Sequence, residues 1–103
     1  MSDKSYEMIF CIINSGFSET VMDAAREAGA RGGTVVRARG TAGKEAEELF
    51  KITVHPDKEV VMILVPKDIK DDVLSAIYKS TGIDTAGQGI AFSVAVNRTV
   101  GLG

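Results

Sequence analysis

Apolar and polar residues along the chain form segments that predict four strands and two helices. Runs rich in β-branched and other apolar residues, bounded by glycine, proline or charged residues, are typical of strands. Apolar residues that recur three and four positions apart are typical of helices packed on one side. The strands are expected at residues 6–14, 34–39, 59–65 and 90–96, and the helices at residues 18–27 and 69–81.

The helix ends carry recognisable signals. Ser18 and Asp68 are the expected caps, because their side-chain oxygens can accept a hydrogen bond from a first-turn N–H group. Asp71, three residues after Asp68, would form a weaker capping box. Gly29 and Gly82 are expected to end the two helices.

The remaining segments are shorter. A loop is expected over 40–44, a short polar helix over 44–49 and a half-buried strand over 50–54. The run at 59–65 is nearly all apolar, which predicts a central strand buried on both sides. Arg37 and Arg39 are expected on the polar face of their strand, with no role assigned to them.

The resulting order of elements, β-α-β-β-α-β, predicts an α+β fold of the ferredoxin-like kind. Two helices would cover one face of a four-stranded antiparallel sheet, in a single domain over residues 1–103. The other face would need a cover, and self-association would provide one.

The composition excludes some classes of partner. The 103 residues carry a net charge of −2 and no cluster of Lys or Arg, so nucleic acid is not an expected partner. Cys11 is the only cysteine, which excludes an intramolecular disulfide and favours a buried strand residue over a nucleophile. No signal-like or membrane-spanning apolar stretch is found, and a cytoplasmic protein is expected.

Residues suited to catalysis or metal binding are few. His55 is the only histidine, and it stands beside Pro56 in an expected turn, where a solvated side chain is usual. Neither a zinc site nor a Ser-His-Asp arrangement can be built from it. Glu45, Glu47 and Glu48 fit a solvated helical face better than a carboxylate site. The sequence therefore predicts that the protein is not an enzyme and holds no metal.

A glycine-rich turn precedes the last strand. The Gly-Gln-Gly sequence at 87–89 has little side-chain bulk, so its backbone N–H groups could approach a phosphate closely. The next residue is Ile90, which offers no positive charge to a phosphate. On these residues alone, a plain tight turn into an edge strand is favoured over a phosphate site.

Five short stretches resemble the nitrogen-regulatory PII family and its PII-like relatives. Their order and spacing carry the resemblance, which spans nearly the whole chain. The stretches are Phe10-Cys11-Ile12-Ile13; Ala28-Gly29-Ala30-Arg31-Gly32-Gly33-Thr34-Val35; Arg39-Gly40; Val61-Met62-Ile63-Leu64-Val65-Pro66 with Asp68; and Thr81-Gly82 followed by Gly87-Gln88-Gly89.

The resemblance implies a homotrimer with adenine nucleotides bound in the clefts between neighbouring subunits, and no covalently bound cofactor. It also implies contacts to the base from two positions, and to the phosphates from the start of the long loop and the glycine-rich turn. This makes the turn a candidate phosphate site after all. The residues implied are Thr34 and Leu64 at the base, Gly40, Gly87, Gln88 and Gly89 at the phosphates, and Thr41 as a further nucleotide-binding residue.

Departures from the family pattern change the expected ligand. Ile90 stands where the family carries a phosphate-binding Lys, and residues 100–103 replace its Arg-x-Arg pair, for which Arg98 is no clear match. The loop is short, has no Tyr for covalent modification, and lacks the Gln that helps bind a metal and 2-oxoglutarate. A triphosphate of about −4 charge would be poorly neutralised. ADP, AMP or a cyclic nucleotide is therefore favoured over ATP with Mg and 2-oxoglutarate.

Two functions remain open. The first is a PII-like signal-transduction regulator that binds an adenine nucleotide and acts on a membrane transporter or metabolic enzyme. Its loop over 40–50 would be mobile until a ligand or partner orders it. The second is an oligomeric ferredoxin-like interaction or scaffold protein with no nucleotide ligand. Nucleotide binding separates the two, and a small enzyme is the least supported class.

Overall fold

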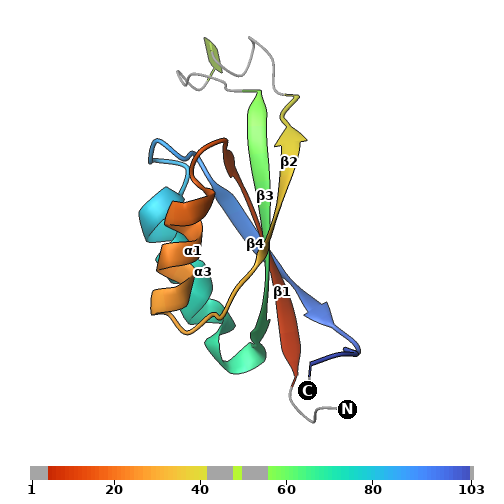
Figure 1. Cartoon of the computed structure of the whole chain (residues 1–103). Helices are drawn as coiled ribbons and strands as arrows, with labels where there is room; N and C mark the ends of the chain where they lie inside the picture. Colours follow the sequence, from red (N-terminus) through yellow and green to blue (C-terminus); the bar gives the residue numbers. More distant parts are fainter. Residues whose placement is uncertain (1–4, 42–47, 50–55, 103) are drawn as a thin grey trace.

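A four-stranded antiparallel sheet with two helices on one face forms the molecule (Figure 1). The computed structural model describes residues 5–41, 48–49 and 56–102. The strand order is β2-β3-β1-β4, so β2 and β4 are the two edges. This confirms the predicted ferredoxin-like fold. The elements are β1 Tyr6–Asn14, α1 Ser18–Glu27, β2 Thr34–Arg39, β3 Asp57–Pro66, the 3-10 helix η1 Lys67–Ile69, α3 Lys70–Thr81 and β4 Ile90–Val96.

Both predicted helix caps are wrong. Ser18 is the first helical residue of α1, Phe17 holds the cap position, and no side chain caps the helix. Asp68 lies inside η1, because the chain leaves Pro66 directly into a 3-10 turn, and Ile69 precedes α3 without a side-chain cap. The capping box with Asp71 is therefore absent. The acidic residues of the first turn of α3 still stabilise it through the helix dipole.

The two predicted helix ends agree with the structure. Gly29 follows α1 with φ of 111°, a left-handed conformation that glycine adopts without a Cβ penalty. Gly82 follows α3, and its N–H donates to the carbonyl oxygen of Tyr78 at 2.9 Å. A Cβ at Gly82 would lie 2.5 Å from that same oxygen, so the exit from α3 requires glycine.

The hydrophobic core lies between the helices and one face of the sheet. Alternate residues of β1 and β3 point into it, since side chains of a strand alternate between the two faces. Both helices contribute a narrow row of buried residues. Met22 in α1 and Thr81 in α3 are buried as well, although the spacing of apolar residues in the sequence does not predict it. The buried apolar residues are Ile9, Cys11, Ile13, Val21, Met22, Ala25, Ala30, Val61, Ile63, Val65, Val73 and Ile77.

No helix of the described residues covers the other face of the sheet. The prediction that β3 is buried on both sides is wrong, because Val60, Met62 and Leu64 face this side and are only half-buried. Phe10 and Phe92 stack there, with ring centroids 5.3 Å apart. We call this side the open face. By strand register it carries the apolar residues Met8, Phe10, Ile12, Val36, Val60, Met62, Leu64, Ile90, Phe92 and Val94.

Several predictions fall on residues that the structure does not describe. These are the strand at 50–54, most of the helix at 44–49, His55, and two of the three glutamates before it, Glu45 and Glu47. The middle of the long loop lies there too, so its expected mobility stays a prediction.

The core assignment can be tested with Ile63→Ala. Ile63 is fully buried, so truncation should lower the free energy of unfolding by about 2–5 kcal/mol. Urea unfolding at fixed protomer concentration measures this. Val100→Ala is the control, because Val100 is 92% exposed and its loss should change stability by less than about 0.5 kcal/mol. Equal unfolding midpoints for both variants would contradict the assigned core.

Candidate functional site

The glycine-rich turn is closed by its own backbone. The N–H of Gln88 donates to the carbonyl oxygen of Thr85 at 3.0 Å, and the N–H of Gly89 donates to that of Thr81 at 2.6 Å. Two of the three N–H groups expected to meet a phosphate are therefore already used within the chain. The hydrogen bonds among the described residues include none from the N–H of Ala86 or Gly87, which leaves those two groups as the turn's donors.

Packing explains both glycines of the turn. A Cβ at Gly89 would lie 2.4 Å from the carbonyl oxygen of Thr81 and 2.7 Å from Cγ2 of Ile13. A Cβ at Gly87 would lie 3.2 Å from Cβ of Thr81. Gln88 between them has φ of 48°, an uncommon conformation for a residue with a side chain. The turn thus has a complete structural reason for its glycines, independent of any ligand.

Asn14, at the end of β1, holds the turn to the sheet. Its backbone N–H donates to the carbonyl oxygen of Gly87 at 2.9 Å. Its side-chain Nδ2 donates to the carbonyl oxygen of Ala86 at 3.0 Å and lies 3.4 Å from Oε1 of Gln88. Its Oδ1 accepts a hydrogen bond from Nζ of Lys58 at 2.5 Å. Hydrogen bonding from Asn14 therefore reaches three consecutive residues of the turn.

Lys58 brings a positive charge to this end of the sheet. It lies on β3 opposite Asn14 of β1 and opposite Ala38 of β2. A Cβ at Gly40 would lie 3.1 Å from Cε of Lys58, so the lysine side chain runs past Gly40 toward Asn14. The N–H of Gly40 donates to the carbonyl oxygen of Pro56 at 2.6 Å, which closes the base of the long loop. The candidate residue Gly40 and the turn are therefore linked through Lys58 and Asn14.

The structure does not gather all predicted site residues within one chain. Thr34, Gly40 and the exposed Thr41 lie on or just after the edge strand β2, and Leu64 lies on β3. The turn leads into β4, the opposite edge (Figure 1). Three strand spacings separate the two edges, which is about 14 Å. One small ligand cannot contact Thr34 and the turn of the same chain.

The remaining residues of interest are placed as follows. Ile90 is 53% exposed at the start of β4, so the position of the missing family lysine is accessible. Arg37 and Arg39 are exposed on β2, opposite Glu59 and Asp57 of β3, and Arg98 is exposed after β4.

Cys11 is a core residue, as predicted. It is fully buried, and burial raises the pKa of its thiol to about 11, with a hydrogen bond to Thr81 acting in the opposite direction. The thiol is therefore protonated at neutral pH and is no nucleophile. In the part of the chain that the structure describes, no three His, Cys, Asp or Glu residues gather in a way that could hold a metal.

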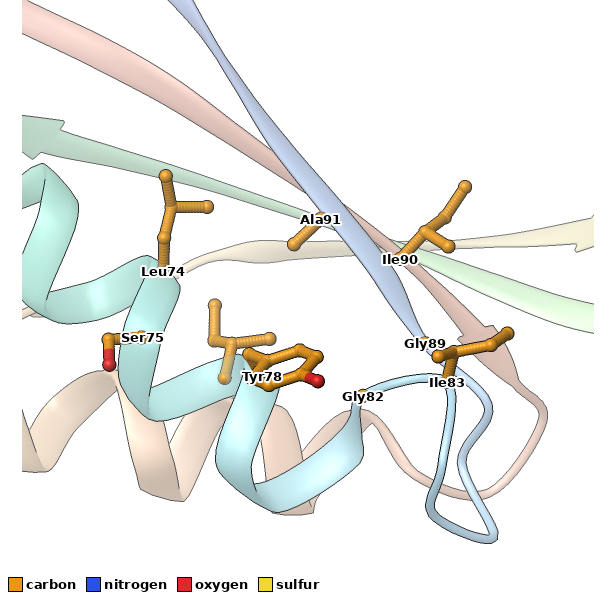
Figure 2. Close-up of a pocket in the computed structure, with 9 residues that line it drawn as sticks. Leu74, Ser75, Tyr78, Gly82, Ile83, Gly89, Ile90 and Ala91 are labelled. Atoms are coloured by element: carbon orange, nitrogen blue, oxygen red, sulfur yellow. The ribbon is translucent and has the colours of Figure 1, made fainter.

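An apolar hollow of about 510 Å³ lies between α3 and the start of β4 (Figure 2). Figure 2 shows Leu74 and Tyr78 of α3 on the side of β4 to which Ala91 points, with Ile83 beside Gly82 and Ile90 pointing away from the helix. Gly82 and Gly89 line its end, so the hollow abuts the glycine-rich turn on the helix side of the sheet.

Three residues that matter here escaped sequence reasoning. Asn14 and Thr81 lie at the ends of regular elements, and Lys58 is the second residue of β3, where polar residues are ordinary. Their importance comes from contacts across strands, such as the pairing of Lys58 with Asn14, 44 positions apart. The Lys58–Asn14 pairing could have been found only by fixing the register of β1 and β3.

Comparison with known proteins gives the family. The family model described as nitrogen regulatory protein P-II matches residues 6–102. The chain belongs to the P-II family. The comparison with curated protein sequences gives no match. Proteins of the family are regulatory, bind small-molecule effectors, are typically trimers and act on target proteins.

Solved structures share the fold of this P-II protein. PII of Arabidopsis thaliana bound to citrate is 24% identical, with a TM-score of 0.67 over 91% of this chain and 77% of that one. A PII-like signalling protein of Thermus thermophilus is 14% identical, with a TM-score of 0.68 over 90% and 87%. A Bacillus cereus protein related to NIF3 is 11% identical, with a TM-score of 0.70 over 95% of this chain but 27% of that one.

Among the helices that the structure describes, none is long and apolar enough to cross a bilayer.

The packing role of the turn's glycines predicts the effect of Gly89→Ala. The new Cβ would press on the carbonyl oxygen of Thr81, which cannot move without disturbing the end of α3. The free energy of unfolding should fall by about 1–3 kcal/mol, measured by urea unfolding. Gly32→Ala is the matched control, since a Cβ there meets no atom within 4 Å. If both variants are as stable as the parent, the turn is not packed as described.

Proposed function

We propose that this P-II protein is a cytoplasmic signal-transduction regulator that binds an adenine nucleotide between subunits of a homotrimer. The observation that supports the proposal is that Thr34, on the edge strand β2, lies across the sheet from the glycine-rich turn, which leads into the other edge strand. Two neighbouring copies could bring them to one ligand: Thr34 and Leu64 from one copy, and Gly40 with the glycine-rich turn from the next.

The open face supports self-association. Phe92 and Val94 are each about half exposed there, beside the half-buried apolar residues of β1 and β3. A contiguous apolar sheet face of this kind marks an interaction site, because burying it removes apolar surface from water. The number of subunits, three, is taken from what is typical of the family.

The charge of the site favours a ligand with few phosphates. The turn offers the N–H groups of Ala86 and Gly87, and among the described residues Lys58 brings a positive charge to it through Asn14. This is less positive charge than a triphosphate of about −4 requires. ADP, AMP or a cyclic nucleotide fits better than ATP. The citrate bound by the Arabidopsis relative is also a compact anion, which is in keeping with an anion site.

The turn also favours the second candidate, a scaffold without a nucleotide. Its glycines are explained by packing, and the N–H groups of Gln88 and Gly89 are used internally. In that case the open face would still drive assembly, and partner binding alone would provide the function. The two candidates therefore differ only in whether the turn binds phosphate.

The protein would contact its target protein through the long loop after Gly40. Its base is closed by the hydrogen bond from Gly40 to Pro56, at the same end of the sheet as the turn. A ligand at this end would lie beside the base of the loop and could change what the loop presents. The target would be a membrane transporter or a metabolic enzyme.

Calorimetry with AMP, ADP and ATP tests the nucleotide. The parent should bind AMP or ADP more tightly than ATP. Ile90→Lys should raise the affinity for ADP and ATP by roughly ten- to a hundred-fold, because a charge-assisted hydrogen bond contributes about 1.5–3 kcal/mol. Ile83→Lys adds the same charge on the helix side of the turn, where Ile83 is 50% exposed, and should change little. If the parent binds none of the three nucleotides, the nucleotide proposal is refuted and the scaffold function is the one that stands.

Sedimentation equilibrium tests assembly through the open face. The parent should sediment as a trimer at micromolar concentration. Val94→Asp should shift it toward monomer, since a carboxylate would have to be buried in the interface. Tyr78→Asp is the control, because Tyr78 is 62% exposed on the helix side. A stable monomer of the parent, or an unchanged trimer of Val94→Asp, would refute this interface.

A further inference from the structure

One carboxamide joins the two parts of the candidate site. Asn14 is only 4% exposed, and every polar atom of its side chain has a partner. Its Oδ1 faces Lys58 on β3, and its Nδ2 faces Ala86 and Gln88 of the turn. Both atoms belong to one planar group, so a rotation that serves one partner disturbs the other.

On the turn side, the side chain of Asn14 stabilises the unfavourable backbone conformation of Gln88. Gln88 is left-handed, which costs free energy for a residue with a side chain. Its Oε1 lies 3.4 Å from Nδ2 of Asn14, and the same Nδ2 donates to the carbonyl oxygen of Ala86. The shape of the turn therefore depends on where the Asn14 carboxamide points.

On the loop side, Asn14 holds Lys58 beside Gly40. The side chain of Lys58 passes so close to Gly40 that a Cβ there would be 3.1 Å from Cε. The ammonium ends on Oδ1 of Asn14, a short charge-assisted bond at 2.5 Å. Displacing this ammonium would change the packing against Gly40, whose N–H closes the loop base on Pro56.

We propose that Asn14 is a positioning residue that couples the glycine-rich turn to the base of the long loop. A change in the turn at Gln88 rotates the carboxamide, weakens the bond to Lys58 and loosens the loop base at Gly40. By linkage, a change at Lys58 loosens Gln88 to the same extent. The use of this coupling in signalling rests on the proposed function, but the coupling itself is a property of the chain without ligand.

Native-state amide exchange, followed residue by residue by NMR, tests the coupling. In the ligand-free protein, Lys58→Met should speed exchange of the Gln88 N–H on the order of tenfold, although the structure shows no hydrogen bond between Lys58 and Gln88, both described residues. Exchange at Ile63, in the core, reports global stability and is used to correct for it. Lys67→Met is the matched control, because it removes a lysine charge at the other end of β3 and should leave Gln88 unchanged.

A second substitution identifies Asn14 as the link. Asn14→Asp keeps an oxygen for Lys58 but loses the Nδ2 donor to the turn. In that background Lys58→Met should no longer affect exchange at Gln88. If it speeds exchange at Gln88 as much as in the parent, or has no effect in the parent itself, the coupling through Asn14 is refuted.

The reverse direction covers the case in which Asn14→Asp fails to fold. Gln88→Met removes Oε1 and should speed exchange of the Gly40 N–H after the same correction for global stability. An unchanged rate at Gly40 would overturn the proposal. Should the parent bind no nucleotide, the proposed function falls, while these exchange rates still decide whether Asn14 couples the two segments.

Discussion

The structure depends on the fact that the helices of the described segments cover one face of the sheet and not the other. Each strand of the sheet has two sets of side chains, and here one set fills the core while the other is left on the open face. In β1 this gives Ile9, Cys11 and Ile13 to the core and Phe10 and Ile12 to the open face. A chain of this size buries only a modest core. Burying the apolar side chains of the open face would therefore add stabilisation that the core alone does not provide.

The fold could be predicted from the sequence because strand and helix periods are local properties. The bounds of β1, α1, β2 and β4 match the predicted segments, and the ferredoxin-like order follows from them. Among the features of the fold that were predicted wrongly are the cap at Asp68 and the burial of β3 on both sides. Asp68 has the chemistry of a cap, but Pro66 leads the chain into a 3-10 turn before α3 starts. The apolar run of β3 indicates burial on both sides, and sequence alone does not show that one side lacks a cover.

The candidate site was predicted only in outline. Glycine at 40, 87 and 89 can be read from the sequence, but what each N–H group binds depends on residues far away in the chain. Gly89 donates to Thr81 because α3 and β4 meet there, and Lys58 reaches Asn14 because β1 and β3 pair in one register. Whether the predicted residues bind a nucleotide stays a prediction, since the strand order separates Thr34 from the turn within one chain.

The close contact between Gly89 and the carbonyl oxygen of Thr81 makes this glycine a requirement of folding. Any side chain at position 89 would collide with the backbone there, whether or not the turn binds an anion. The glycine therefore carries no information about a ligand, and a charged side chain beside the turn is the feature that would distinguish an anion-binding turn from a purely structural one.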